Sequence, residues 1–203
     1  MTPRWLGTLE YGAALRIQEQ ARIDALGGGE SLILGLEHLP VITLGKRGGD
    51  VVGAAERAGY AVWRTRRGGL ATCHEPGQLV GYLIVDARVH GVRRLVEAVE
   101  GCLIEWLSVQ GLRATRRDGY PGVWSEGEFG WSKVGAVGMQ VRNGWTTHGF
   151  ALNLQNSLRG FTLISPCGIA DASVTSLQRE CGFSPSPLEA FEHLGPALRA
   201  ALS

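Results

Sequence analysis

The chain has very little lysine. Of its 203 residues, 20 are basic, and only Lys46 and Lys133 among them are lysine. The formal net charge is +1, which argues against non-specific nucleic-acid binding, because that binding depends on an excess of basic residues. Residues 61–120 carry nine arginines against six acidic residues. This local excess is compatible with a surface for an acidic partner or with a solvated face.

Several signatures of other protein classes are missing. No run approaches the roughly 18 apolar residues of a membrane-spanning helix, and residues 1–12 lack the apolar core of a secretory signal. The sequence therefore predicts a cytoplasmic protein without a membrane partner. Its four cysteines form no C-x-x-C pair and are expected to be free thiols.

Nucleotide-binding motifs are also missing. Gly45-Lys46 is followed by Arg47 and lacks the upstream glycine of a P-loop, and no G-x-G-x-x-G occurs. We therefore expect a substrate that is already activated, and no cofactor.

The composition, 44% hydrophobic and 19% charged, is that of a globular protein, and the length predicts a single domain over residues 1–203. Helical patterns cover residues 9–26, 51–58, 92–109 and 187–202. Strand-like patterns cover residues 31–36, 41–44, 60–64, 79–85, 112–115, 123–125, 133–142 and 145–154. This irregular order predicts an α/β fold with a mixed sheet (α+β), without the regular alternation of a Rossmann fold.

Local signals sharpen three of these elements. Asn143-Gly144 predicts a tight hairpin turn between two strands. Ser186-Pro187-Leu188-Glu189 has the signature of a helix start. Thr175, with Gln178 three residues later, predicts the cap of a short helix.

The string RRGGLATCHEPGQ at residues 66–78 is the most unusual in the chain. Its glycines allow backbone N–H groups to approach a ligand, and His74 is a side chain able to exchange a proton near neutral pH. A glycine-rich turn with a structural histidine is the alternative. Metal binding through Cys73, His74 and a distant cysteine is disfavoured, because adjacent ligands without a second pair give poor tetrahedral geometry.

A second string, SKVGAVGM at residues 132–139, contains one of the two lysines. A lysine amine can lose its proton when it is buried or lies near another charge, whereas an arginine effectively cannot. Lys133 is therefore a candidate catalytic amine. A packed stem with a solvated ammonium is the alternative.

Two further strings follow, THGFALN at residues 147–153 and SPCGI at residues 165–169. Cys102 lies in an apolar helical pattern, where thiols are inert. Cys167 lies instead in a turn rich in proline and glycine, where an amine or a helix dipole would lower its pKa.

Together, in this order and spacing, the four strings resemble the lipoyl (octanoyl) transferase family over nearly the whole chain. The resemblance implies the fold of biotin and lipoate protein ligases, a mixed sheet with a smaller sheet and flanking helices. It implies transfer of an octanoyl group from octanoyl-acyl carrier protein to a lysine of lipoyl domains. The acceptors are then 2-oxoacid dehydrogenase E2 subunits and the glycine cleavage H protein, and no metal takes part.

The resemblance also implies roles for residues. Cys167 is the acyl-thioester nucleophile, and Lys133 lowers the pKa of its thiol. The substrate-binding residues are Arg67, Gly68, Gly69, Leu70, Ala71, Thr72, Cys73, His74, Ala136, Val137, Gly138, His148, Gly149, Phe150 and Ala151.

Glu75 departs from the family, which usually has glycine there. If this position needs a positive φ, glutamate costs about 1 kcal/mol, and a carboxylate beside His74 favours the protonated imidazole. Two other functions stay open: an ATP-dependent lipoate or biotin ligase, and an acyl-carrier-binding module that does not catalyse.

Overall fold

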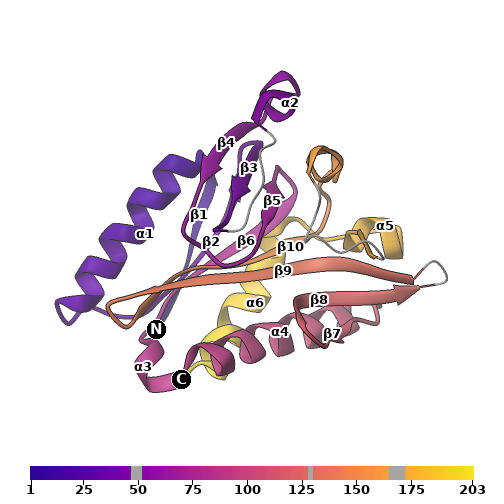
Figure 1. Cartoon of the computed structure of the whole chain (residues 1–203). Helices are drawn as coiled ribbons and strands as arrows, with labels where there is room; N and C mark the ends of the chain where they lie inside the picture. The colour runs from indigo at the N-terminus through magenta and orange to yellow at the C-terminus, as the bar shows by residue number, and fades with distance from the viewer. Residues whose placement is uncertain (47–51, 128–129, 165–171) are drawn as a thin grey trace.

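The computed structural model describes residues 1–46, 52–127, 130–164 and 172–203 (Figure 1). The strands are β1 (Thr2–Leu9), β2 (Leu32–His38), β3 (Val41–Leu44), β4 (Ala61–Arg64), β5 (Ala71–His74), β6 (Gln78–Ile84), β7 (Thr115–Arg117), β8 (Tyr120–Gly127), β9 (Gly130–Arg142), β10 (Trp145–Asn153) and β11 (Ala172–Val174). The helices are α1 (Tyr11–Leu26), α2 (Val52–Arg57), α3 (Ala87–His90), α4 (Val92–Val109), α5 (Leu177–Cys181) and α6 (Pro187–Ala201), with a 3-10 turn η1 (Arg159–Leu163).

Within these residues the strands form two sheets. The larger has eight strands in the order β1-β2-β6-β10-β9-β8-β7, with β11 paired to β9, and the smaller has the order β4-β3-β5. Both sheets mix parallel and antiparallel pairs. In the large sheet β1 runs parallel to β2, and β9 antiparallel to β10. In the small sheet β3 runs parallel to β4 and antiparallel to β5. The expected mixed-sheet α/β class with a smaller second sheet is confirmed.

Alternating side chains direct the two faces of the large sheet into different cores. Ile33, Leu83 and Leu152 belong to the core that contains α4 and α6 residues. Their neighbours along the same strands, among them Leu34 and Tyr82, belong to the core that contains α1 residues. This period of two is what a sheet covered on both faces requires. Figure 1 shows the small sheet beyond one end of this layered body.

Most predicted elements are confirmed. Helix α4 has the expected bounds, and Ser186 and Glu189 form the expected capping box of α6. Asn143 and Gly144 both have positive φ between β9 and β10, as a type I′ hairpin turn needs. The strands predicted over 31–36 and 41–44 are both present, but β2 and β3 lie in different sheets.

Other predictions need correction. No strand covers residues 112–114, and β7 begins only at Thr115. The cap of α5 is Ser176, whose side chain accepts a hydrogen bond from the Arg179 N–H. Thr175 instead donates to Glu180 over 2.5 Å. Strands β1 and β5 were not predicted, because β1 has no buried side chain and β5 lies inside the glycine-rich string.

Candidate active site

A cavity of about 440 Å³ opens where the β9–β10 hairpin faces the loop between β4 and β5. Its lining includes Arg67, Gly68, Gly69, Leu70, Ala71, Thr72, His74, Lys133, Ala136, Val137, Gly138, His148, Gly149, Phe150 and Ala151. Residues from three of the four predicted strings therefore meet around one space. Cys167, the predicted nucleophile, lies outside the described residues, as does the rest of SPCGI.

The glycine-rich loop is held to the small sheet by Arg67. Its Nη2 donates to the Thr43 carbonyl over 2.6 Å, its Nε donates to Thr43 Oγ1 over 3.1 Å, and its Nη1 donates to the Gly68 carbonyl over 2.9 Å. The loop lies against β9, since a Cβ added at Gly138 would lie 3.6 Å from the Gly68 carbonyl oxygen. These contacts bring the first and second strings together, although about 70 residues separate them in sequence.

Gly149 shows why the third string needs its glycine. It pairs with Tyr82 where β10 meets β6, and a Cβ added there would lie 2.3 Å from the Gly81 carbonyl oxygen. No side chain fits at that separation, so any other residue would force β10 away from β6 at the cavity wall.

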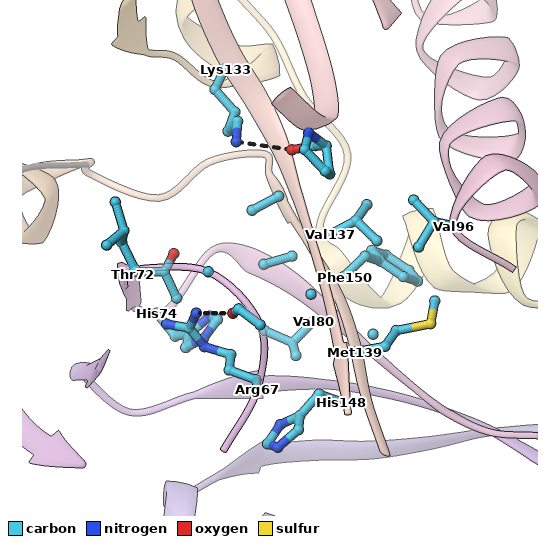
Figure 2. Close-up of a pocket in the computed structure, with 18 of the residues that line it drawn as sticks. Arg67, Thr72, His74, Val80, Val96, Lys133, Val137, Met139, His148 and Phe150 are labelled. Carbon is cyan, nitrogen blue, oxygen red and sulfur yellow. Dashed lines mark hydrogen bonds between the residues drawn. The ribbon is translucent and has the colours of Figure 1, made fainter. Parts of the chain in front are cut away.

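Lys133 is buried in the cavity wall, with 9% of its surface exposed. Its Nζ donates to the Pro121 carbonyl over 3.0 Å (Figure 2) and lies 4.5 Å from the centre of the Trp124 ring. An ammonium over an aromatic face is attracted by the ring's negative charge density. Of the two interpretations of this lysine, the snorkelling head is therefore wrong, because the ammonium is held inside the protein.

Helix α4 supports the segment that receives the lysine. Glu100 is 5% exposed and accepts hydrogen bonds from the Gly122 N–H over 2.7 Å and from Arg116 Nε over 3.0 Å. The Arg117 guanidinium stacks on Tyr120 at 4.6 Å. Part of the arginine excess in residues 61–120 thus binds groups of the protein itself, although the Arg116 side chain is 50% exposed.

His74 is a buried, neutral side chain. Burial, followed by the neighbouring His38, lowers the pKa of His74 to about 3. Its Nδ1 lies 2.7 Å from Gln78 Oε1, while Gln78 Nε2 donates to the Asn153 side chain over 2.8 Å. This network assigns the His74 proton to Nδ1. The expectation that His74 exchanges a proton near neutral pH is therefore wrong.

His148 lies at the opposite end of the cavity from Lys133 (Figure 2). Its φ of +60° is rare for a residue other than glycine, and strain of this kind clusters at functional sites. Burial, followed by the charge of Arg67, lowers the pKa of His148 to about 4. Two neutral imidazoles and one arginine thus belong to the polar part of the lining, with Lys133 and Thr72.

The apolar part of the lining was only partly foreseen. Figure 2 shows Val96, Val137, Met139 and Phe150 together on one side of the cavity, away from Arg67. The cavity also includes Tyr11, Val80, Tyr82, Val92, Gly119, Tyr120 and Pro121. Val96 follows the apolar periodicity of α4, but no sequence pattern singles out Tyr11 or Tyr82 for this site.

Glu75 does not act on His74 as expected. Its φ is not positive, and its carboxylate turns to the segment before η1. One oxygen accepts from the Leu158 N–H over 2.5 Å and from Ser157 Oγ over 3.2 Å, and the other accepts from the Tyr60 hydroxyl over 2.7 Å. Both expectations for Glu75, backbone strain and a protonated His74, are therefore wrong.

The described cysteines do not line the cavity. Cys73 is fully buried in the core of the small sheet, and burial raises the pKa of its thiol far above the ordinary range. Burial also raises the pKa of Cys102 and of Cys181. No group of three His, Cys, Asp or Glu side chains in the described parts of the chain is arranged to hold a metal ion.

Comparison with known proteins decides the family. The family model for the lipoyl protein ligase A/B catalytic domain matches residues 10–199. An octanoyltransferase of Chloroflexus aurantiacus is 43% identical over 204 residues, which span 96% of this chain and 90% of that protein. The chain belongs to the octanoyltransferase family. An octanoyltransferase of Mycobacterium tuberculosis is 42% identical over 202 residues, which span 98% of this chain and 86% of that protein. This octanoyltransferase family member is accordingly an acyltransferase.

Solved structures confirm the fold implied by the resemblance. A lipoate-protein ligase A bound with ATP superposes with a TM-score of 0.72 at 15% identity, over 99% of this chain and 84% of the other. A bipartite lipoate protein ligase from Thermoplasma acidophilum, studied with its E2 lipoyl domain, gives 0.67 at 17% identity, over 100% and 84%. A biotin protein ligase from Aquifex aeolicus gives 0.56 at 12% identity, over 100% and 68%.

In the described part of the chain, no helix has both the length and the apolar character needed to cross a bilayer.

Proposed function

We propose that the protein transfers an octanoyl group from octanoyl-acyl carrier protein to a lysine of a lipoyl domain, through a thioester on Cys167. The acceptors are lipoyl domains of 2-oxoacid dehydrogenase E2 subunits and the glycine cleavage H protein. The 43% identity to a full-length octanoyltransferase supports the acyl group. A ligase of the same fold was studied with its E2 lipoyl domain, which supports the acceptor class.

The observation that carries the proposal is the buried ammonium of Lys133 in the wall of a partly apolar cavity. Ala172, five residues after Cys167, begins strand β11, in which Val174 pairs with Lys133 itself. The proposal assigns this ammonium to the Cys167 thiol, which lies five residues before the start of β11 in the sequence. An ammonium beside a thiol lowers the thiol pKa and raises the fraction of thiolate.

The first step exchanges one thioester for another. The Cys167 thiolate attacks the octanoyl carbonyl, the bond to the carrier sulfur breaks, and the leaving thiolate takes a proton from the Lys133 ammonium. The exchange has little free-energy cost because both sides are thioesters, so no nucleotide is needed. Backbone N–H groups of the glycine-rich loop are candidate donors to the oxyanion that forms during the attack.

The second step forms the amide. The acceptor lysine enters as its neutral amine, having lost one proton to solvent, and its nitrogen attacks the Cys167 thioester. The neutral Lys133 amine accepts the proton that this nitrogen gives up as the amide forms. The bond to the Cys167 sulfur breaks, and the released thiolate pairs again with the Lys133 ammonium. This step runs downhill, since an amide is more stable than a thioester. His74 and His148, with pKa values of about 3 and 4, are too weakly basic to take this proton at neutral pH.

The test is a complete transfer reaction without ATP. We expect purified octanoyl-acyl carrier protein and a lipoyl domain to give octanoylated lipoyl domain by mass spectrometry, and Cys167→Ser to abolish the product. Transfer of free octanoate that requires ATP and survives Cys167→Ser would instead support a ligase. Binding of the carrier protein without transfer would support the non-catalytic module. The cytoplasmic location expected from the sequence stays a prediction.

A further inference from the structure

A second cavity, of about 500 Å³, lies beside the first and contains an unusual set of charges. We call it the basic cavity. Its lining includes Arg22, Arg66 and Arg142, with Gln18 and Gln140. Among the described residues of the lining, Glu19 is the single acidic one. Three guanidiniums against one carboxylate leave this small space with a clear positive excess.

Two side chains that line the basic cavity each carry a buried donor with no hydrogen-bond partner among the described residues. The donors are Arg22 Nη1 and Gln18 Nε2, from side chains that are 3% and 1% exposed. The two residues are four apart on α1 and therefore lie on the same face of the helix. A buried donor without a partner costs free energy comparable to a lost hydrogen bond, so each of these two side chains gains from an acceptor that reaches it.

The remaining bonds of these side chains fix them in place. Glu19 accepts from Arg22 Nε over 3.0 Å and from Arg22 Nη2 over 2.7 Å, which leaves Nη1 as the group without a partner. Gln18 Oε1 accepts from the His148 N–H over 2.7 Å. Arg142 reaches Glu19 at 3.2 Å from the β9–β10 hairpin, which extends to α1 in Figure 1. The site is thus assembled from α1 and from strands that also line the first cavity.

We propose that the basic cavity binds a phosphate group. Arginine matches phosphate with paired hydrogen bonds, and a tetrahedral anion has enough acceptor oxygens for several guanidiniums and the Gln18 amide together. His148 lines both cavities, so a phosphate in the basic cavity lies next to a ligand bound in the first cavity. We assign this phosphate to the phosphodiester that joins the carrier protein to its pantetheine arm, an assignment that rests on the proposed function. Free phosphate is the other source.

The first arm of the test does not depend on catalysis. Inorganic phosphate is titrated into the ¹⁵N-labelled protein, with chloride at equal ionic strength as the reference. We expect phosphate to shift the Gln18 side-chain amide and the His148 backbone amide. The double variant Arg66→Gln, Arg142→Gln should lose this response, and Arg94→Gln, an exposed arginine of α4 outside both cavities, should keep it. Equal shifts with chloride, or no shift, would overturn the site.

The second arm identifies the source. The ratio of kcat/KM for octanoyl-phosphopantetheine to that for octanoyl-pantetheine should fall about tenfold in the double variant, the effect of one lost charge-assisted hydrogen bond. The ratio should be unchanged in Arg94→Gln. A wild-type ratio near one, together with phosphate binding, would overturn the donor as the source and assign free phosphate. If neither thioester is a substrate, the proposed function fails, while the titration still decides the site.

Discussion

At the scale of single residues, the proposed chemistry depends on a lysine that an arginine cannot replace. Lys133 is one of two lysines among 20 basic residues, and its ammonium is held by the Pro121 carbonyl and the Trp124 ring. Lys46, the other lysine, is exposed at the end of β3. The two therefore form a natural pair of test and control.

We predict that Lys133→Arg and Lys133→Met each lower kcat for octanoyl transfer at least about a hundredfold, the usual contribution of a proton-transferring group. The arginine keeps the positive charge but cannot give up its proton. Lys46→Met should retain the wild-type kcat. Steady-state transfer rates measure the effect, and an active Lys133→Arg enzyme would exclude the proton-transfer role.

The buried histidines make stability depend on pH. Burial lowers the pKa of His74 to about 3 and of His148 to about 4, below the ordinary value of about 6.5 that applies to the unfolded chain. As the pH falls below this value, the unfolded chain binds protons that the folded protein does not, so the free energy of unfolding decreases. We expect a loss of about 2 kcal/mol per histidine between pH 7 and pH 5.

Urea unfolding at the two pH values measures this loss. In His74→Gln and in His148→Gln the decrease in the free energy of unfolding should be about 2 kcal/mol smaller than in the wild type. Equal losses in the wild type and both variants would mean that these side chains take up protons in the folded protein over the same pH range as in the unfolded chain.

At the scale of elements, the turns that carry the site are tied to each other by buried polar groups. Glu75, in the turn between β5 and β6, is 3% exposed and binds the residues that precede η1. Leu158 there has a φ of +62°, a strained conformation that its hydrogen bond to Glu75 helps to hold. The glutamate that departs from the family pattern thus has a structural role at the start of η1.

We predict that Glu75→Ala lowers the free energy of unfolding by about 3 kcal/mol, because it removes a charged acceptor from several buried donors. The Leu158 amide should also exchange its hydrogen faster than in the wild type. Glu192→Ala, at an exposed position of α6, is the control for loss of a carboxylate. A Glu75→Ala protein as stable as that control would show that the network contributes nothing.

Elements with strong local signals were predictable, and those that depend on distant partners were not. The capping box of α6 and the Asn143-Gly144 turn are specified within four residues. β5 hydrogen-bonds to β3, about 30 residues earlier, and its string suggests a turn when viewed alone. The orientation of the Glu75 side chain was also not predictable from the neighbouring sequence, because its partners Ser157 and Leu158 lie about 80 residues further on.

At the scale of the whole molecule, the candidate active-site cavity lies where the two sheets meet. The glycine-rich loop of the cavity is fixed to the small sheet by the hydrogen bond from Arg67 to Thr43. The large sheet contributes Lys133, and α4 contributes Val96 to the apolar side. The resemblance predicted that residues of the strings meet, and three of the four strings do so in the described part of the chain. The shape of the cavity follows from packing between layers, and Tyr11 and Tyr82 join its wall only in the folded chain. The single domain over residues 1–203 stays a prediction.

The apolar side of the cavity gives a prediction about chain length. Val96→Phe adds volume next to Val137 and Phe150, so we expect the ratio of kcat/KM for hexanoyl to octanoyl carrier protein to rise several-fold. Val109→Phe, at a position of the same helix that is 79% exposed, should leave the ratio unchanged. An unchanged ratio in Val96→Phe would mean that the acyl chain lies elsewhere.

The thioester on Cys167 is tested most directly by the intact mass of the protein after incubation with octanoyl-acyl carrier protein and no acceptor. We predict one octanoyl adduct in the wild type. The same adduct should form in the triple variant that combines Cys73→Ala, Cys102→Ala and Cys181→Ala, in which Cys167 is the remaining cysteine. The adduct should be absent in Cys167→Ser and should disappear when a lipoyl domain is added. An adduct that persists in Cys167→Ser, or octanoyl transfer to the lipoyl domain by that variant, would contradict the acyl-enzyme.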